Sequence, residues 1–452
     1  MQAMTIIDRR KNLRALITLA IPVILEQIMT TLLQYVDSAM VGRLGPQATA
    51  SVNLTTSVNW LIGNCFSAVG IAAVAIIAAA YGAGDFQKIK TISTQVVNYI
   101  IIVGLLVGSL AVSLSPFIPV WMNADSEIQE QAASYFRIIS FPLLFRAASV
   151  ISASALRAVK DTKTPMLVNL AANILNVVLN AILIYPAGLG VRGAAIATSI
   201  STTLSGAAML IVMLHHPLLK TQIRPLYIDK EITKQVASIG LPAFATSAVS
   251  CMGHIVFAAL VSSQGTVVFA AHSIALSAES LFYLPGYGLR SATSTLIGIT
   301  VGENNYEKFK VVQRQSIILT VLMMTLTGTA LFLLARPIMA IFTPDLQVIA
   351  LGARVLKLIA LSEPLFGLMI VCEGIYYGLG QTRTTFIVTT IGSWGIRILF
   401  TLICVRVLHT SLLQIWMCMF ADNAFRALAM AIPLLSGRGR CYFETRRKSL
   451  NL

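Results

Sequence analysis

Long apolar segments follow one another along almost the whole chain, with only short polar breaks between them. Each is long enough to cross a hydrocarbon core of roughly 30 Å as a helix. The sequence is 56% hydrophobic and only 11% charged, whereas about a quarter of the residues in an average soluble domain are charged. These features predict an all-α integral membrane protein with nothing left over for a soluble domain.

Twelve membrane-spanning helices are expected. The spans are residues 13–40, 50–80, 92–115, 130–155, 165–187, 193–215, 234–262, 269–301, 312–335, 347–378, 385–407 and 412–435. Several exceed the roughly 20 residues that a span needs, so tilted or bent helices are expected. The candidate bends are Pro22, Pro142, Pro242, Pro285 and Pro364.

The net charge of +15 would suit a nucleic-acid binder, but the placement of the basic residues indicates membrane topology instead. With these spans, most of the 33 lysines and arginines fall on the side of the N-terminus, and only Arg43, Arg192, Arg336 and Arg406 lie in or beside the opposite loops. The positive-inside rule then places both termini in the cytoplasm, which requires an even number of spans. We expect a multi-pass protein of the plasma membrane that binds no nucleic acid.

Chemistry that would need a cofactor finds no support in the sequence. Most of the six cysteines lie inside predicted spans, without the spacing of a disulfide framework or a metal site. The chain has no Gly-x-x-x-x-Gly-Lys-Ser/Thr loop for nucleotide phosphates, so a gradient rather than ATP is expected to drive transport. Neither the continuous polar path of a channel nor the residue cluster of an intramembrane enzyme is present. We therefore expect a transporter that is not an enzyme and holds no metal or other cofactor.

The chain repeats itself at an offset of 220 residues. The matching positions are Pro22 with Pro242, Gly45 with Gly265, Asp125 with Asp345, and Thr162 and Thr164 with Thr382 and Thr384. The loop from Gly82 to Lys90 also lies over the loop from Gly302 to Lys310. A single match could arise by chance, but a series that keeps one offset indicates an internal duplication.

Each repeat holds six spans, an even number, so both halves insert in the same orientation. Two such six-helix bundles would face each other across a cavity that can open to either side, which suits alternating access better than a pore. The predicted domains are an N-terminal lobe (1–215), a cytoplasmic linker (216–233), a C-terminal lobe (234–435) and a basic cytoplasmic tail (436–452).

The two halves differ in the polar residues that they place inside the membrane. The residues Asp37, Asn176, Asn180 and Thr198 of the first half meet Phe257, Ile396, Phe400 and Cys418 of the second. Measured from the outer helix ends at about 1.5 Å per residue, the four polar residues lie about 9 to 15 Å deep. Because they share one layer, they predict a polar site that exists in the first half only.

Asp37 is the residue of this layer that can couple transport to an ion. An ionised carboxylate that faces lipid costs at least a few kcal/mol, so Asp37 must face the bundle interior or carry a proton. Such a group can exchange a proton according to which side of the membrane is open. The alternative role for the amides and the hydroxyl is to hold helices together, at about 0.6 kcal/mol each. We favour that alternative for Asn169 and Asn173.

Several motifs of the chain resemble those of the multidrug and toxic compound extrusion (MATE) family, in the same order and over nearly the whole length. In the first half they are Asp37-Ser-Ala-Met-Val-Gly-Arg-Leu-Gly45, Gly82-Ala-Gly-Asp85, Ala155-Leu-Arg-Ala-Val-Lys-Asp-Thr-Lys-Thr-Pro165, Asn176-x-x-x-Asn180 and Gly193-Ala-Ala-Ile-Ala-Thr198. In the second half they are Ala271-His-Ser-Ile-Ala-Leu-Ser277, Pro285-Gly286, Gly378-Leu-Gly-Gln-Thr382, Trp394-Gly-Ile-Arg397 and Arg426-Ala427.

The resemblance implies a V-shaped, twelve-helix antiporter that expels amphipathic, often cationic compounds in exchange for protons or sodium. It also implies that Asp37 is the coupling carboxylate and that Asn176, Asn180 and Thr198 accompany it. Asn180 stands where archaeal members have a second acid, which argues against a tight sodium site, so H⁺ is favoured over Na⁺. A flippase for a lipid-linked saccharide is the alternative function, although it would be expected to have a strongly cationic cavity and often extra helices.

Members that carry an acidic pair in the C-terminal lobe place one acid on the seventh helix and one on the tenth. This chain has Val249 and Ser250 at the first position and Phe366 or a neighbour at the second. Cation coupling through that lobe is therefore not expected in its usual form. We expect the protein to work as a monomer in the lipid bilayer.

Three further residues are candidates for the substrate cavity, namely Gln34, Tyr35 and Glu279. Glu279 lies about 15 Å below the outer surface and could instead pair with an arginine such as Arg290. Elsewhere in the second half, Asp422 and Arg426 are four residues apart on one helix face and predict a local ion pair.

Overall fold

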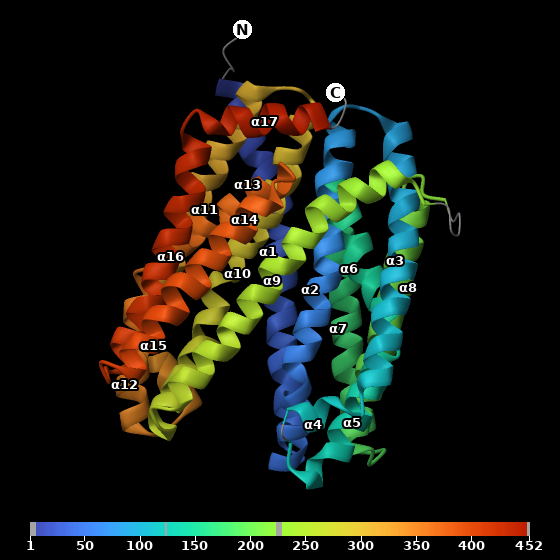
Figure 1. Cartoon of the computed structure of the whole chain (residues 1–452). Helices are drawn as coiled ribbons and strands as arrows, with labels where there is room; N and C mark the ends of the chain where they lie inside the picture. Colours follow the sequence, from blue (N-terminus) through green and yellow to red (C-terminus); the bar gives the residue numbers. More distant parts are fainter. Residues whose placement is uncertain (1–5, 123, 223–227, 450–452) are drawn as a thin grey trace. The chain divides into compact units, whose positions relative to one another are not determined.

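The computed structural model describes residues 6–122, 124–222 and 228–449, and every regular element in these ranges is a helix (Figure 1). The first half contains α1 (Ile6–Gly42), α2 (Pro46–Gly82), α3 (Phe86–Leu114), α4 (Ile118–Trp121), α5 (Ser126–Ser140), α6 (Leu143–Ala158), α7 (Lys163–Ile184) and α8 (Gly190–His215). The second half contains α9 (Lys230–Ser262), α10 (Thr266–Gly302), α11 (Tyr306–Phe342), α12 (Leu346–Ala360), α13 (Glu363–Gly378), α14 (Thr382–Thr390), the π-helix η1 (Ile391–Ile398), α15 (Leu399–Arg406), α16 (Leu412–Leu435) and α17 (Arg438–Ser449).

The predicted all-helical membrane architecture is confirmed. Within the described ranges, 10 helices are long and apolar enough to span a membrane, and two bent helix pairs bring the number to 12. The pair α5 and α6 bends by 50°, and the pair α12 and α13 bends by 52°. Pro142 and Pro364 lie at these two breaks, as expected of a residue that cannot continue a helix. Pro22, Pro242 and Pro285 instead lie inside continuous helices.

The internal repeat recurs in the helix boundaries. Helices α2 and α10 both have 37 residues, and both follow a glycine with φ of 110°, Gly45 and Gly265. The loops after these helices also match, because the side chains of Asp85 and Asn305 each cap the next helix by accepting from the backbone N–H three residues on. The bent pairs begin and end at positions 220 apart, at Ser126 and Leu346 and at Ala158 and Gly378. The two halves are therefore two copies of the same supersecondary unit.

The chain forms two compact units, whose boundaries fall inside α1 and α9. The N-terminal unit is Leu25–Gly240, and the C-terminal unit is the chain up to Ile24 together with the chain from Leu241 onward. The start of α1 packs on the C-terminal unit, where Gln315 donates to the Arg9 carbonyl and Ile24 lies against Gly288. The compact units therefore change at residues 24 and 240, whereas the predicted lobes end at residue 215 and begin at residue 234.

The predicted linker and tail both contain helix. Residues 223–227 of the linker lie outside the described residues, and α9 already begins at Lys230. The tail forms α17, whose Phe443 packs against Tyr306 and Phe309 at the start of α11. The Arg447 side chain also donates to Asn304. The tail is therefore held on the C-terminal unit at the same end as the start of α1.

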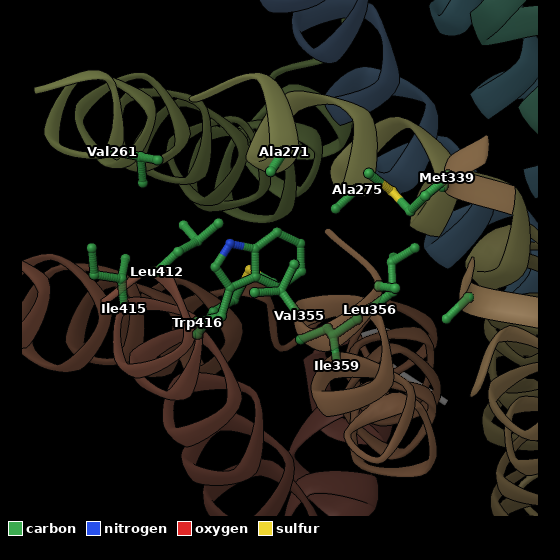
Figure 2. Close-up of a cluster of buried hydrophobic side chains, with 14 of the residues drawn as sticks. Val261, Ala271, Ala275, Met339, Val355, Leu356, Ile359, Leu412, Ile415 and Trp416 are labelled. Carbon is green, nitrogen blue, oxygen red and sulfur yellow. The ribbon is translucent and has the colours of Figure 1, made fainter. Parts of the chain in front are cut away.

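The core of the C-terminal unit is built around Trp416 of α16 (Figure 2). Its indole ring is fully buried among aliphatic side chains, which include Val355 and Leu356 of α12 and Leu412 of α16 itself. Phe257 belongs to the same cluster and contacts the His272 ring at 5.5 Å. Phe257 is the residue that the repeat aligns with Asp37. The position that carries a carboxyl group in the first half is therefore filled by packed aromatic rings in the second.

Candidate functional site

Helices α1 and α7 are joined by a row of hydrogen bonds between polar side chains. Asn169 donates to Glu26 at 2.7 Å, and Asn173 donates to Thr30 at 3.1 Å. Asn180 donates to Asp37 at 2.8 Å. The three pairs are each 143 residues apart in sequence, so the two helices run side by side in register. The pair nearest the C-terminal ends of both helices brings Asp37 and Asn180 together.

Asp37, Asn176, Asn180 and Thr198 form one hydrogen-bonded group, as the sequence predicts. Asn176 and Asn180 are buried on one face of α7, Thr198 comes from α8, and Asp37 is half-buried on α1. The Asn180 amide nitrogen lies 2.8 Å from Asp37 Oδ1 and 3.3 Å from Asn176 Oδ1. The Asn176 amide lies 3.3 Å from Thr198 Oγ1. All four belong to the N-terminal unit.

The Asn176 amide fits this group with its nitrogen toward Asp37. In this orientation it donates to Oδ2 at 2.7 Å and to Oδ1 at 3.1 Å, and its oxygen accepts from the Thr198 hydroxyl and backbone N–H. An ionised carboxylate only accepts hydrogen bonds. Asp37 therefore has amide donors from both Asn176 and Asn180.

Asp37 differs from the other acid of this row in its charge partner. Glu26 forms an ion pair with Arg157, whose Nη2 lies 2.8 Å from Oε2. Asp37 forms no ion pair with any residue of the described ranges, and its neighbours are amides and a hydroxyl. The charge of Asp37 can therefore change without breaking an ion pair, whereas a change of charge at Glu26 would break its pair with Arg157. The contacts of Asn169 and Asn173 fit the structural role proposed for them.

The three candidate cavity residues lie on α1 and α10. Gln34 is exposed and Tyr35 half-buried on α1, and Glu279 is buried on α10 in the C-terminal unit. Glu279 interacts electrostatically with Arg397 and with Glu363. It does not pair with Arg290, because that side chain bonds Glu373 at 3.0 Å. The alternative given for Glu279 was interaction with an arginine such as Arg290; the arginine that interacts with it is Arg397, whereas Arg290 bonds Glu373 of α13.

The ion pair predicted between Asp422 and Arg426 is confirmed and has a third member. Asp422 is fully buried and lies 2.7 Å from Arg426 Nε and 2.8 Å from Arg397 Nη2. Arg397 projects from the π-helix η1, and Asn423 accepts from both guanidinium groups. A Cβ atom at Gly392 would collide with Asp422, so only glycine permits this approach. Sequence spacing alone does not reveal the π-helical turn that brings Arg397 here.

Two residues of the N-terminal unit were missed by the sequence reasoning. Tyr135 on α5 interacts electrostatically with both Asp37 and Arg146. Arg146 lies at the start of α6 and donates to Asn59 of α2. Both residues lie in the bent pair of α5 and α6. Across a bend, residue spacing no longer shows which face of a helix points inward. The only available signal was the presence of an arginine inside an apolar span.

Comparisons with known proteins agree with this architecture. The model of the MatE family matches residues 22–182 and 242–403, twice and again 220 residues apart. The chain is 30% identical over 433 residues to the "Probable multidrug resistance protein NorM" of Thermotoga maritima, covering 94% of this chain and 92% of that protein. It is 23% identical to the "Probable multidrug resistance protein YoeA" of Bacillus subtilis, covering 97% and 95%.

Solved structures show the same fold. A crystal structure of MATE in the straight conformation superposes with a TM-score of 0.89 at 22% identity, covering 97% of each chain. A transporter of the MOP superfamily from Pyrococcus furiosus superposes with a TM-score of 0.86 at 22% identity, covering 98% of this chain and 97% of that one. The family match in both halves and the Thermotoga relative identify the family as well as the fold. The chain belongs to the MatE family of transporters.

Proposed function

We propose that the protein is a secondary antiporter that exports amphipathic, often cationic compounds in exchange for protons. The observation that carries this proposal is Asp37, a carboxyl group inside a membrane span that accepts hydrogen bonds from amides and has no ion pair among the described residues. The relatives named as multidrug resistance proteins support drugs and toxins as the cargo. The direction of transport would be out of the cell, across the plasma membrane.

Exchange follows because the cationic cargo and the proton compete for the Asp37 carboxylate. When Asp37 is ionised, it attracts a cationic cargo, and when it is protonated, this attraction is lost. If the site opens alternately to the two sides, cargo loads from the cytoplasm as a proton leaves Asp37, and the reverse exchange occurs outside. No covalent step or cofactor is required.

The donor set favours the proton over sodium. Sodium is a hard cation that needs several oxygen ligands, as other hard cations do. Around Asp37 the amides of Asn180 and Asn176 both present their nitrogens. Sodium would have to turn both amides and lose their hydrogen bonds. A proton needs no such set of oxygen ligands.

Transport under separately imposed gradients tests this proposal. Inside-out vesicles that contain the protein would be given either an acidic lumen or a sodium-loaded lumen, with the methyl ester of rhodamine B outside as a permanent cation. We expect the acidic lumen to drive dye uptake without sodium. Uptake that needs sodium and ignores the pH difference would replace the proton as the coupling ion, and no uptake under either gradient would refute antiport of this cargo.

The remaining expectations are parts of the same proposal. Both termini would lie in the cytoplasm, because most basic residues fall on that side of the spans. The protein would work as a monomer, because each repeat supplies one half of a transport unit within the same chain. Gln34, Tyr35 and Glu279 remain candidates for contact with cargo.

A further inference from the structure

Helices α3 and α11 occupy equivalent places in the two repeats, and one glutamine of each bonds the backbone at the start of another long helix. The Gln95 side chain of α3 accepts from the backbone N–H of Asp229, just before α9, at 3.2 Å. The Gln315 side chain of α11 donates to the carbonyl oxygen of Arg9 in α1 at 2.9 Å. Arg9 and Asp229 are 220 residues apart, and so are the two glutamines. The two contacts are therefore equivalent, and the surfaces around them can be compared.

In the first half, the chain that leads into α9 covers this surface of α3. The backbone N–H of Gln222 donates to the Thr94 hydroxyl at 3.3 Å, and the Tyr99 hydroxyl lies 2.8 Å from that of Thr233. Thr94 is only 6% exposed, and Asn98, one turn further along α3, is 3% exposed. The polar side chains of this surface are therefore shielded by the protein itself.

In the second half, the equivalent surface of α11 is open. Arg314 stands at the position of Thr94 and Ile318 at the position of Asn98. Arg314 is exposed, Ile318 is 48% exposed, and Leu322 continues the row at 63%. Because these three residues are spaced four apart, they form one stripe along the helix, with the basic residue at its N-terminal end. We call it the α11 stripe.

The first turns of α1 carry a second stripe of the same kind. Arg10 and Arg14 are exposed, and Ile17 and Ile21 follow them at 37% and 49% exposure. Spacings of four, three and four residues place all four side chains on one face of the helix, which we call the α1 stripe. The hydrogen bond to the Arg9 carbonyl keeps this part of α1 next to α11.

The arginines of the two stripes carry positive charge that the protein does not balance. No Asp or Glu whose side chain the structure describes forms an ion pair with Arg10, Arg14 or Arg314. The nearby acids Glu303 and Glu307 are each paired with a lysine of α11 instead. Arg14 and Arg314 also lie at the beginning of the predicted spans 13–40 and 312–335, which is the height of the lipid headgroups.

We propose that the α1 and α11 stripes bind anionic phospholipids, with the phosphate groups on Arg10, Arg14 and Arg314 and the acyl chains on the aliphatic side chains below. A guanidinium matches a phosphate with two parallel hydrogen bonds. Basic residues beside a membrane span attract negatively charged headgroups, whereas a zwitterionic headgroup carries a cation that offsets this attraction. The inference assigns a lipid site rather than a cargo and goes beyond the proposed function.

Lipid binding to the purified protein in detergent tests the inference. Native mass spectrometry would compare the affinities for phosphatidylglycerol and for phosphatidylcholine with the same acyl chains. We expect wild type to prefer phosphatidylglycerol, and Arg14→Gln and Arg314→Gln each to weaken its binding about fivefold. Binding of phosphatidylcholine should stay within about twofold of wild type, because its net charge is zero. Equal affinity of wild type for the two lipids would overturn the inference.

Matched variants on α17 separate this site from the general positive charge of the protein. Arg438→Gln and Lys448→Gln each remove one exposed charge from the same unit without touching either stripe. Both should keep the affinity for phosphatidylglycerol within about twofold of wild type. A loss as large as that in Arg314→Gln would overturn the inference in favour of unspecific attraction.

A water-soluble phosphate separates a lipid site from a site for small anions. Glycerol 3-phosphate carries the charged group without acyl chains, so we expect it not to displace phosphatidylglycerol at equal concentration. Displacement would overturn the lipid in favour of a free anion. If either arginine variant does not fold, the lipid preference of wild type still decides. Since none of these measurements uses an ion gradient or a drug, their outcome is independent of the proposed antiport.

Discussion

Replacing Asp37 with asparagine is expected to abolish proton-driven export while the protein remains folded. The amide has nearly the same shape as the carboxyl group and can still bond Asn180, so stability should change by only about the 0.6 kcal/mol of one interhelical hydrogen bond. It cannot bind or release a proton. Uptake of the cationic dye under an acidic lumen should therefore fall to the level of vesicles without the protein.

The same substitution should remove the pH dependence of dye binding. In wild type, lower pH protonates Asp37 and weakens binding of a cation, so affinity should rise as pH rises. In Asp37→Asn, affinity should be weak and independent of pH. The matched control is Asn173→Ala, which breaks the bond to Thr30 in the same row of hydrogen bonds and should leave coupling intact. Unchanged gradient-driven uptake in Asp37→Asn would show that the coupling group lies elsewhere.

The largest loss of stability is expected from Asp422→Asn. This change leaves the guanidinium groups of Arg397 and Arg426 buried without the carboxylate that both contact. Removing one partner of a buried ion pair typically costs about 3–5 kcal/mol. We expect a large drop in the melting temperature of the purified protein or failure to recover it in folded form.

An exposed ion pair of the same spacing provides the comparison. Arg440 and Glu444 of α17 also form a pair four residues apart, at 2.9 Å, but both side chains are well exposed. Glu444→Gln should therefore change stability by less than about 1 kcal/mol. If the two variants melted at the same temperature, the triad of Asp422, Arg397 and Arg426 would not have the structural role assigned to it here.

The group around Asp37 was predictable because helices obey simple geometry. A residue's depth in a span follows from its distance to the helix end, and Asn176 and Asn180 share a face because they are four apart. The repeat then revealed which polar positions one half has and the other lacks. What it could not reveal was the orientation of the Asn176 amide, which depends on Thr198 of another helix.

Residues on irregular segments were not predictable in this way. Arg146 lies just past a 50° bend, so counting residues from the start of α5 misplaces the face that it occupies. Arg397 lies in a π-helix, whose wider turn changes the side from which the guanidinium reaches Asp422. Arg290 and Glu373 are 83 residues apart and meet only because α10 packs on α13. In each case, tertiary contacts decide the partner.

The central claim is that cargo and proton compete for Asp37, and proton release on cargo binding tests it most directly. Purified protein in weakly buffered detergent solution would be mixed with the methyl ester of rhodamine B, and the released protons would be followed with a pH indicator. We expect release of up to one proton for each bound dye in wild type and none in Asp37→Asn. Dye binding to wild type without proton release, over the whole pH range in which it binds, would contradict the claim.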